Sequence, residues 1–197
     1  LLLLSTILPA HEHISGNMFM VSSLNTGNGL SSPRVYSIVE AEDGAMWIST
    51  KRGVDRYNGQ LVSNYTLATE MQYSDASGRN IKLTQDHHRQ IYAYDNKGKV
   101  YIYNKVKDTF VLRCNLQKIL GGSIVLNELL VDEKGNFWLA MDKGLYCLSA
   151  SADGKEIVRE KAKGRFILIN TYINHIQYVG QRLLIGTSKD VYCYSVA

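Results

Sequence analysis

Short apolar and aromatic runs alternate with polar turn signals along most of the chain. In the first stretch, the runs VYSIVE, AMWIST, VDRY and LVSNYT are separated by Asp43-Gly44, Lys51-Arg52-Gly53 and Asn58-Gly59. Each run has the length and the β-branched or aromatic content of a strand, and Asn-Gly is a strong hairpin signal. The pattern predicts a four-stranded antiparallel meander.

This unit occurs four times. A bulky anchor residue in the second run recurs every 45 or 46 residues, at Trp47, Tyr92, Trp138 and Leu184. Six residues after the anchors come Gly53, Gly98, Gly144 and Asp190. These residue types tolerate the positive φ of a tight hairpin, and Lys99 looks like one inserted residue in the second copy. A fixed period that includes its own turn chemistry indicates a repeat architecture.

A sheet of this size cannot bury both of its faces alone, so the copies must stack face to face. We therefore predict an all-β fold, a partial β-propeller of about four blades, each a four-stranded antiparallel sheet. The blades are expected near residues 35–66, 80–112, 126–149 and 174–197, with the anchors buried between them and no outer strand in the last copy. Only Leu116 to Leu120 looks helical, which argues against a helical repeat.

The N-terminal region is expected to contain two features. Residues 1–10, LLLLSTILPA, resemble the apolar part of a secretory signal peptide, and the propeller segment is expected over 17–197. Within it, MFMVSSL at 18–24 reads as an extra strand ahead of the first blade. Such a strand could close a four-bladed ring by completing the last sheet, and the alternative is an open arc of a larger ring.

The stretch GLSSPRVYSIVEAEDGAMWISTKRGVDRYNG, Gly29 to Gly59, resembles the two-component regulator propeller repeat, and NELLVDEKGNFWLAMDKGLYCL resembles it well. These repeats occur in the periplasmic sensor regions of Bacteroides-type hybrid two-component histidine kinases. The resemblance implies a ring of about seven blades. It also implies an exported sensor anchored in the inner membrane, a homodimer at full length, and an oligosaccharide ligand linked to polysaccharide use. Its partners would be the remaining blades and the signalling domains.

Two other functions remain open. One is a polysaccharide-active enzyme or a plain glycan-binding propeller without a kinase, and the other is a scaffold propeller for protein partners. No nucleophile elbow, phosphate-binding loop or pair of carboxylates at glycosidase spacing is found in the sequence. We therefore expect no catalytic site in this segment.

The charges and the metal-binding residue types change this picture little. The net charge of +4 is spread along the chain, whereas nucleic-acid binders concentrate their cations, so no nucleic acid is expected to bind. Aligned on the anchors, His88 falls in the same solvent-facing hairpin turn as Asp43 and Lys134. His87 and His88 are also adjacent, and adjacent side chains on an extended chain point in opposite directions. We expect no metal and no cofactor.

Cys147 and Cys193 occupy equivalent places on neighbouring blades, too far apart for a disulfide.

The candidate ligand-binding residues are basic. Five residues after the anchors, the repeat carries Arg52, Lys97, Lys143 and Lys189. All four belong to the turn between the second and third strands, which opens on one face of a propeller. A ring of cations there would favour an anionic ligand, including an acidic oligosaccharide. Tyr73, in the long loop between the first two blades, is the aromatic candidate on that face.

Overall fold

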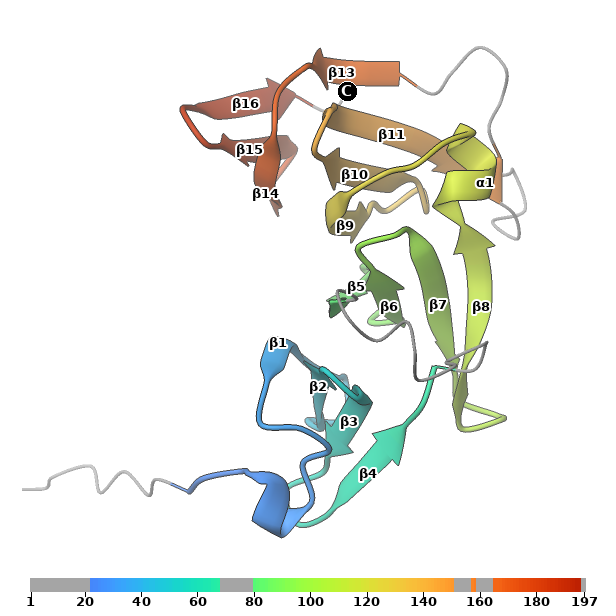
Figure 1. Cartoon of the computed structure of the whole chain (residues 1–197), viewed down its shortest axis with the longest axis vertical. Helices are drawn as coiled ribbons and strands as arrows, with labels where there is room; N and C mark the ends of the chain where they lie inside the picture. Colours follow the sequence, from blue (N-terminus) through green and yellow to red (C-terminus); the bar gives the residue numbers. More distant parts are fainter. Residues whose placement is uncertain (1–21, 68–79, 151–156, 159–164, 196–197) are drawn as a thin grey trace, which may run out of the picture.

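The computed structural model describes residues 22–67, 80–150, 157–158 and 165–195. Its regular structure is almost entirely β. Four antiparallel sheets follow one another along the chain and form an open arc (Figure 1). The predicted all-β fold, a partial β-propeller with four blades, is confirmed. We number these sheets blades 1 to 4 in chain order.

The first two blades are meanders of four strands each. Blade 1 follows a short 3₁₀ turn, η1 (Thr26–Asn28), and consists of β1 (Val35–Glu40), β2 (Met46–Thr50), β3 (Gly53–Tyr57) and β4 (Val62–Tyr65). Blade 2 consists of β5 (Ile81–Gln85), β6 (Ile91–Asp95), β7 (Lys99–Asn104) and β8 (Thr109–Asn115). The helix α1 (Leu116–Leu120) follows directly, where the sequence predicts it.

The last two blades depart from four strands. Blade 3 consists of β9 (Leu126–Val131), β10 (Phe137–Met141), β11 (Gly144–Ala150), β12 (Ile157–Val158) and β13 (Arg165–Ile169), the last two both pairing with β11. Its strands thus continue beyond the expected stretch 126–149. Blade 4 has three strands, β14 (Ile173–Val179), β15 (Arg182–Thr187) and β16 (Val191–Ser195).

The N-terminal strand expected over 18–24 is not found where the structure can test it. Residues 22–24 belong to no strand. Residues 18–21 and the stretch 1–10, with its signal-like sequence, lie outside the described residues.

The turn between the second and third strands explains the repeated glycine. In blade 1, Gly53 pairs with Thr50 and has φ 152°, and a Cβ there would lie 2.5 Å from the carbonyl oxygen of Tyr65. Blade 2 has one more residue in this turn, which fits the insertion expected at Lys99. The expectation for Asp190 is wrong, because its φ is not positive. Its backbone N–H instead donates to the Thr187 hydroxyl at 2.9 Å, which closes this turn without glycine.

Three hydrophobic clusters fill the spaces between successive blades. Trp47 lies between blades 1 and 2, Tyr92 between blades 2 and 3, and Trp138 between blades 3 and 4. Their exposed fractions are 2%, 8% and 4% respectively. Leu184 is only half-buried, because it lies on the face of β15 opposite to Leu183, which packs on blade 3.

The first strands of the blades, β1, β5, β9 and β14, line the concave side of the arc (Figure 1). Hydrogen bonds link them in series. Leu83 N donates to Ser37 Oγ at 2.7 Å, Lys82 Nζ to Asn127 O at 2.8 Å, and Asn127 Nδ2 to Ile173 O at 2.8 Å. These bonds fix the position of each blade along the strand direction relative to the next.

Trp138 offers a direct test of inter-blade packing. Trp138→Ala should lower the free energy of unfolding by about 3–5 kcal/mol, because it empties a well-packed site between two blades. The control is Ile38→Ala, whose side chain is 57% exposed and whose loss should change stability by less than about 0.5 kcal/mol. Denaturant unfolding of both variants is the measurement. Equal effects would contradict the assignment of Trp138 to the inter-blade core.

Candidate functional site

The four predicted cations lie in structurally equivalent turns. Each lies in the turn between the second and third strands of its blade, and they are Arg52, Lys97, Lys143 and Lys189. Because the strands alternate in direction, these turns open on one face of the arc, which we call the cation rim. Arg52, Lys143 and Lys189 are exposed, whereas Lys97 is half-buried. Tyr73 lies outside the described residues.

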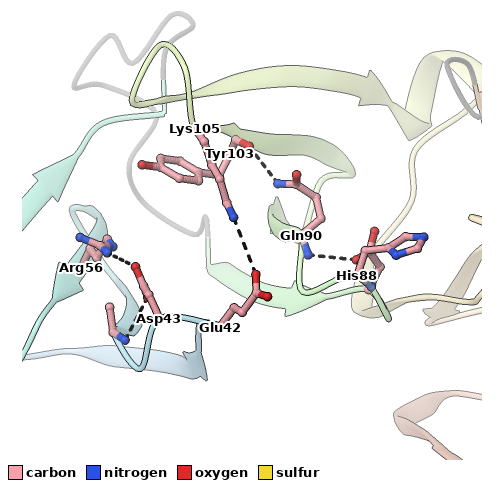
Figure 2. A network of polar contacts seen from close by, with 9 residues as sticks. Glu42, Asp43, Arg56, His88, Gln90, Tyr103 and Lys105 are labelled. Atoms are coloured by element: carbon pink, nitrogen blue, oxygen red, sulfur yellow. Dashed lines mark hydrogen bonds and ion pairs between the residues drawn. The ribbon is translucent and has the colours of Figure 1, made fainter.

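A cleft of about 340 Å³ opens on the opposite face, between blades 1 and 2. Residues from both blades line it, and they are Ala41, Glu42, Asp43, Trp47, Arg56, Arg89, Gln90, Ile91, Tyr103 and Lys105. Figure 2 shows the side chains of the two blades reaching toward one another across this space. Sequence reasoning placed its candidates on the other face and missed the cleft.

The blade 1 side of the cleft is a tight turn between β1 and β2. Ala41 N donates to Ala45 O at 2.8 Å, and Gly44 N donates to Ala41 O at 3.1 Å. Asp43 Oδ1 accepts a further hydrogen bond from Ala45 N at 3.1 Å. The turn therefore holds Glu42 and Asp43 at the mouth of the cleft.

Opposite charges face one another in the cleft (Figure 2). Asp43 is paired with Arg56, whose guanidinium carbon lies 5.7 Å from the centre of the Trp47 ring. The Ala45 N–H and the Arg56 guanidinium together lower the pKa of Asp43. Lys105 of blade 2 lies 4.0 Å from Glu42 of blade 1. Both of these side chains are mostly exposed, so this pair contributes little to stability.

Aromatic rings form the wall behind these charges. The Trp47 ring lies 4.6 Å from Tyr103, 5.1 Å from Tyr65 and 5.6 Å from Phe110, measured between ring centres. The hydroxyls of Tyr103 and Tyr65 donate to the same Asp108 oxygen, at 2.6 and 2.9 Å. These bonds, with that of Tyr103 the stronger, lower the pKa of Asp108. Ring contacts and two hydrogen bonds thus hold the wall together.

The histidine pair differs from the expectation in its geometry. His87 and His88 are exposed in the turn between β5 and β6, where the sequence places His88, but their ring centres are only 3.6 Å apart. The argument that they point in opposite directions is therefore wrong. Across the described ranges, no three His, Cys, Asp or Glu side chains come together as a metal site.

No helix in these ranges is long and apolar enough to span a membrane.

The three cysteines are free thiols in different surroundings. Cys193 is exposed. Burial raises the pKa of Cys114 to about 12, and burial together with the charge of Asp132 raises that of Cys147 to about 12. Because the thiolate is the reactive form, neither of these two half-buried thiols is prepared to act as a nucleophile.

The comparisons with known proteins agree with this architecture. Residues 29–52 match the family model described as two component regulator propeller. No curated protein matches the chain in sequence.

Solved structures resemble the chain in fold. The extracellular domain of the putative one component system BT4673 from B. thetaiotaomicron is 18% identical with a TM-score of 0.64, over 87% of this chain and 23% of that one. That of the putative hybrid two component system BT3049 from the same organism is 19% identical with a TM-score of 0.59, over 89% and 22%. The Cps50 β-propeller domain from Myceliophteria thermophila is 11% identical with a TM-score of 0.52, over 77% and 53%. The chain thus spans less than a quarter of the two extracellular domains.

The thiols provide a prediction that depends on pH. At pH 8, a thiol with a pKa near 12 is ionised in only about one molecule in ten thousand. Cys193 should therefore react rapidly with Ellman's reagent in the folded protein, while Cys114 and Cys147 react only after denaturant is added. As the pH rises through 12 in the folded state, these two pKa values predict increasing reactivity. Rapid reaction of three thiols at pH 8 without denaturant would contradict the raised pKa values of Cys114 and Cys147.

Proposed function

We propose that this chain, which carries a two-component regulator propeller repeat at residues 29–52, is part of the extracytoplasmic sensor of a hybrid two-component regulator. In this proposal the segment is not catalytic. It binds an oligosaccharide, and its occupancy is passed to a histidine kinase in the same full-length protein, which is exported, anchored in the inner membrane and dimeric. The observation that carries the proposal is the coincidence of the matched repeat with blade 1 of a four-blade arc.

A sensor works only if its ligand prefers one arrangement of the protein over another. Two observations support a binding role for this arc. A cleft with charged and aromatic lining is formed between two blades, and four basic residues recur on the opposite rim. The arrangement offers polar groups for recognition, and the raised pKa values of Cys114 and Cys147 do not prepare these thiols for nucleophilic chemistry.

The kinase readout tests the proposal. The intact protein, reconstituted in membranes, should change its histidine autophosphorylation when one member of a panel of plant and host oligosaccharides is added, and it should release no new reducing ends. The control is the same protein without sugar. Cleavage of the sugar with no change in phosphorylation would instead support a polysaccharide-active enzyme, and an open reading frame without a kinase would overturn the sensor.

The cation rim has its own test. Replacing Arg52, Lys97, Lys143 and Lys189 together by Ala should weaken binding of a sulfated or uronate-rich oligosaccharide roughly tenfold at low salt and flatten its salt dependence. The matched control is Lys107→Ala with Lys134→Ala, which removes exposed charges from the opposite face. Titration calorimetry at several ionic strengths is the measurement. Unchanged affinity and unchanged salt dependence would show that these cations serve only as solvated turn residues.

A further inference from the structure

The turns between the first and second strands of blades 1, 2 and 3 share one backbone geometry. In each, the first turn residue donates its N–H to the carbonyl four residues later, at 2.8 to 3.2 Å, and the residue three positions on has φ between 61° and 78°. The first turn residues are Ala41, Asp86 and Asp132. Each lies six positions before its anchor, so the three residues are structurally equivalent.

In blades 2 and 3, the aspartate of this position binds the anchor side chain. Asp132 Oδ2 accepts a hydrogen bond from Trp138 Nε1 at 3.1 Å. Asp86 Oδ2 accepts one from the Tyr92 hydroxyl at 3.3 Å. A carboxylate at this position therefore satisfies the polar atom of a buried aromatic ring.

Blade 1 has the same donor without this acceptor. Ala41 replaces the aspartate, and within the described residues no group accepts a hydrogen bond from Trp47 Nε1. Trp47 is 2% exposed as a residue, but its indole nitrogen is not fully enclosed. This N–H can therefore donate to an acceptor that enters the cleft, and a charged acceptor makes the stronger hydrogen bond. Ala41 and Trp47 both line the cleft, so its lining includes the position that an aspartate occupies in blade 3 and the ring that the aspartate would contact.

The charges around this position favour an anion. Three cations and two carboxylates line the cleft, so the lining has an excess of one positive charge. Asp43 is paired with Arg56, and Glu42 lies near Lys105, which leaves the charge of Arg89 uncompensated within the lining. An incoming carboxylate would balance that charge.

We propose that the cleft binds the carboxylate of a small acidic ligand, whose oxygen accepts from Trp47 Nε1 as Asp132 accepts from Trp138 Nε1. The ligand class is a sugar acid, a hexuronate at the end of an oligosaccharide. The choice of a sugar rests on the proposed function, whereas the recognition of a carboxylate does not. The cleft volume of about 340 Å³ lies at the lower end of small-molecule sites, which suits one or two sugar rings.

The position of the cleft separates this site from the cation rim. A five-residue strand spans about 17 Å between the two faces. This is about twice the distance over which exposed charges act at physiological salt. Variants at one site therefore leave the other site nearly unaffected.

Ala41→Asp tests the proposal, because it supplies from within the chain the carboxylate that the ligand would bring. The turn tolerates aspartate, as blades 2 and 3 show. In the full chain, calorimetry should find that D-galacturonate binds at least about tenfold more weakly to this variant than to the unaltered protein. The matched control is Gln60→Glu, which adds the same charge in the turn between β3 and β4 and should stay within about twofold. D-galactose, which has no carboxylate, should bind much more weakly than D-galacturonate.

The two tryptophans of the chain give a local readout. In NMR spectra, the indole N–H signal of Trp47 should move on addition of D-galacturonate, while that of Trp138, already bonded to Asp132, stays in place. In Ala41→Asp the Trp47 signal should move without any ligand. Circular dichroism confirms that each variant is folded.

The proposal would be overturned if D-galacturonate did not bind, if D-galactose bound as tightly as D-galacturonate, or if D-galacturonate bound Ala41→Asp as tightly as the unaltered protein. None of them bears on kinase control by oligosaccharides. If phosphorylation still responds to a sugar while this cleft does not bind D-galacturonate, the sensor function stands and the ligand contacts another part of the protein.

Discussion

Each blade of this chain presents apolar side chains on both faces of its sheet, and both faces can leave water only when the blade is packed between two neighbours. Blades 2 and 3 satisfy this condition through the three inter-blade clusters. Blade 1 covers part of its outer face with the segment before β1, where Leu30 is buried and Ser31 donates through N and Oγ to the buried Asp55. Blade 4 leaves Val179 and Val191 exposed, 53% and 75% respectively. Stability should therefore grow with each neighbouring blade, as in other repeat proteins.

The parts of the fold that could be predicted are those fixed by local patterning. The period places Trp47, Tyr92 and Trp138 on the second strands of successive blades, and the local pattern locates the α-helix Leu116–Leu120. What escaped prediction depends on long-range or side-chain geometry. The outer strand β13 pairs with β11 after a long intervening stretch, so no local spacing indicates it. The turn at Asp190 is closed by a threonine hydroxyl, for which glycine spacing gives no signal.

The candidate site likewise combines features that the sequence pattern predicts with features that only the three-dimensional structure shows. Alignment on the anchors drew attention to positions where the copies agree, such as the basic residue at Arg52, Lys97, Lys143 and Lys189. The cleft lies at a position where the repeat copies carry different residues. A signal was present, because the residue six positions before the anchor is Ala41 in the first copy and aspartate in the next two. Its meaning requires the observed bond between Asp132 and Trp138, since only that bond shows what Ala41 leaves unsatisfied.

The location of the cleft also bears on how binding could be reported elsewhere. Its lining comes from two separate sheets, with Trp47 and Arg56 on blade 1 and Arg89 and Lys105 on blade 2. The polar contacts that cross between these blades at this rim are exposed, and the 4.0 Å pair of Lys105 with Glu42 is weak. The aromatic wall behind them is held by ring contacts and by hydrogen bonds from Tyr65 and Tyr103 to Asp108. A ligand bridging the two blades would therefore act mainly on the relative position of their rims. A ligand that contacts both blades in this way would bind one arrangement of the propeller more tightly than another, and binding can shift an equilibrium only through such a difference in affinity.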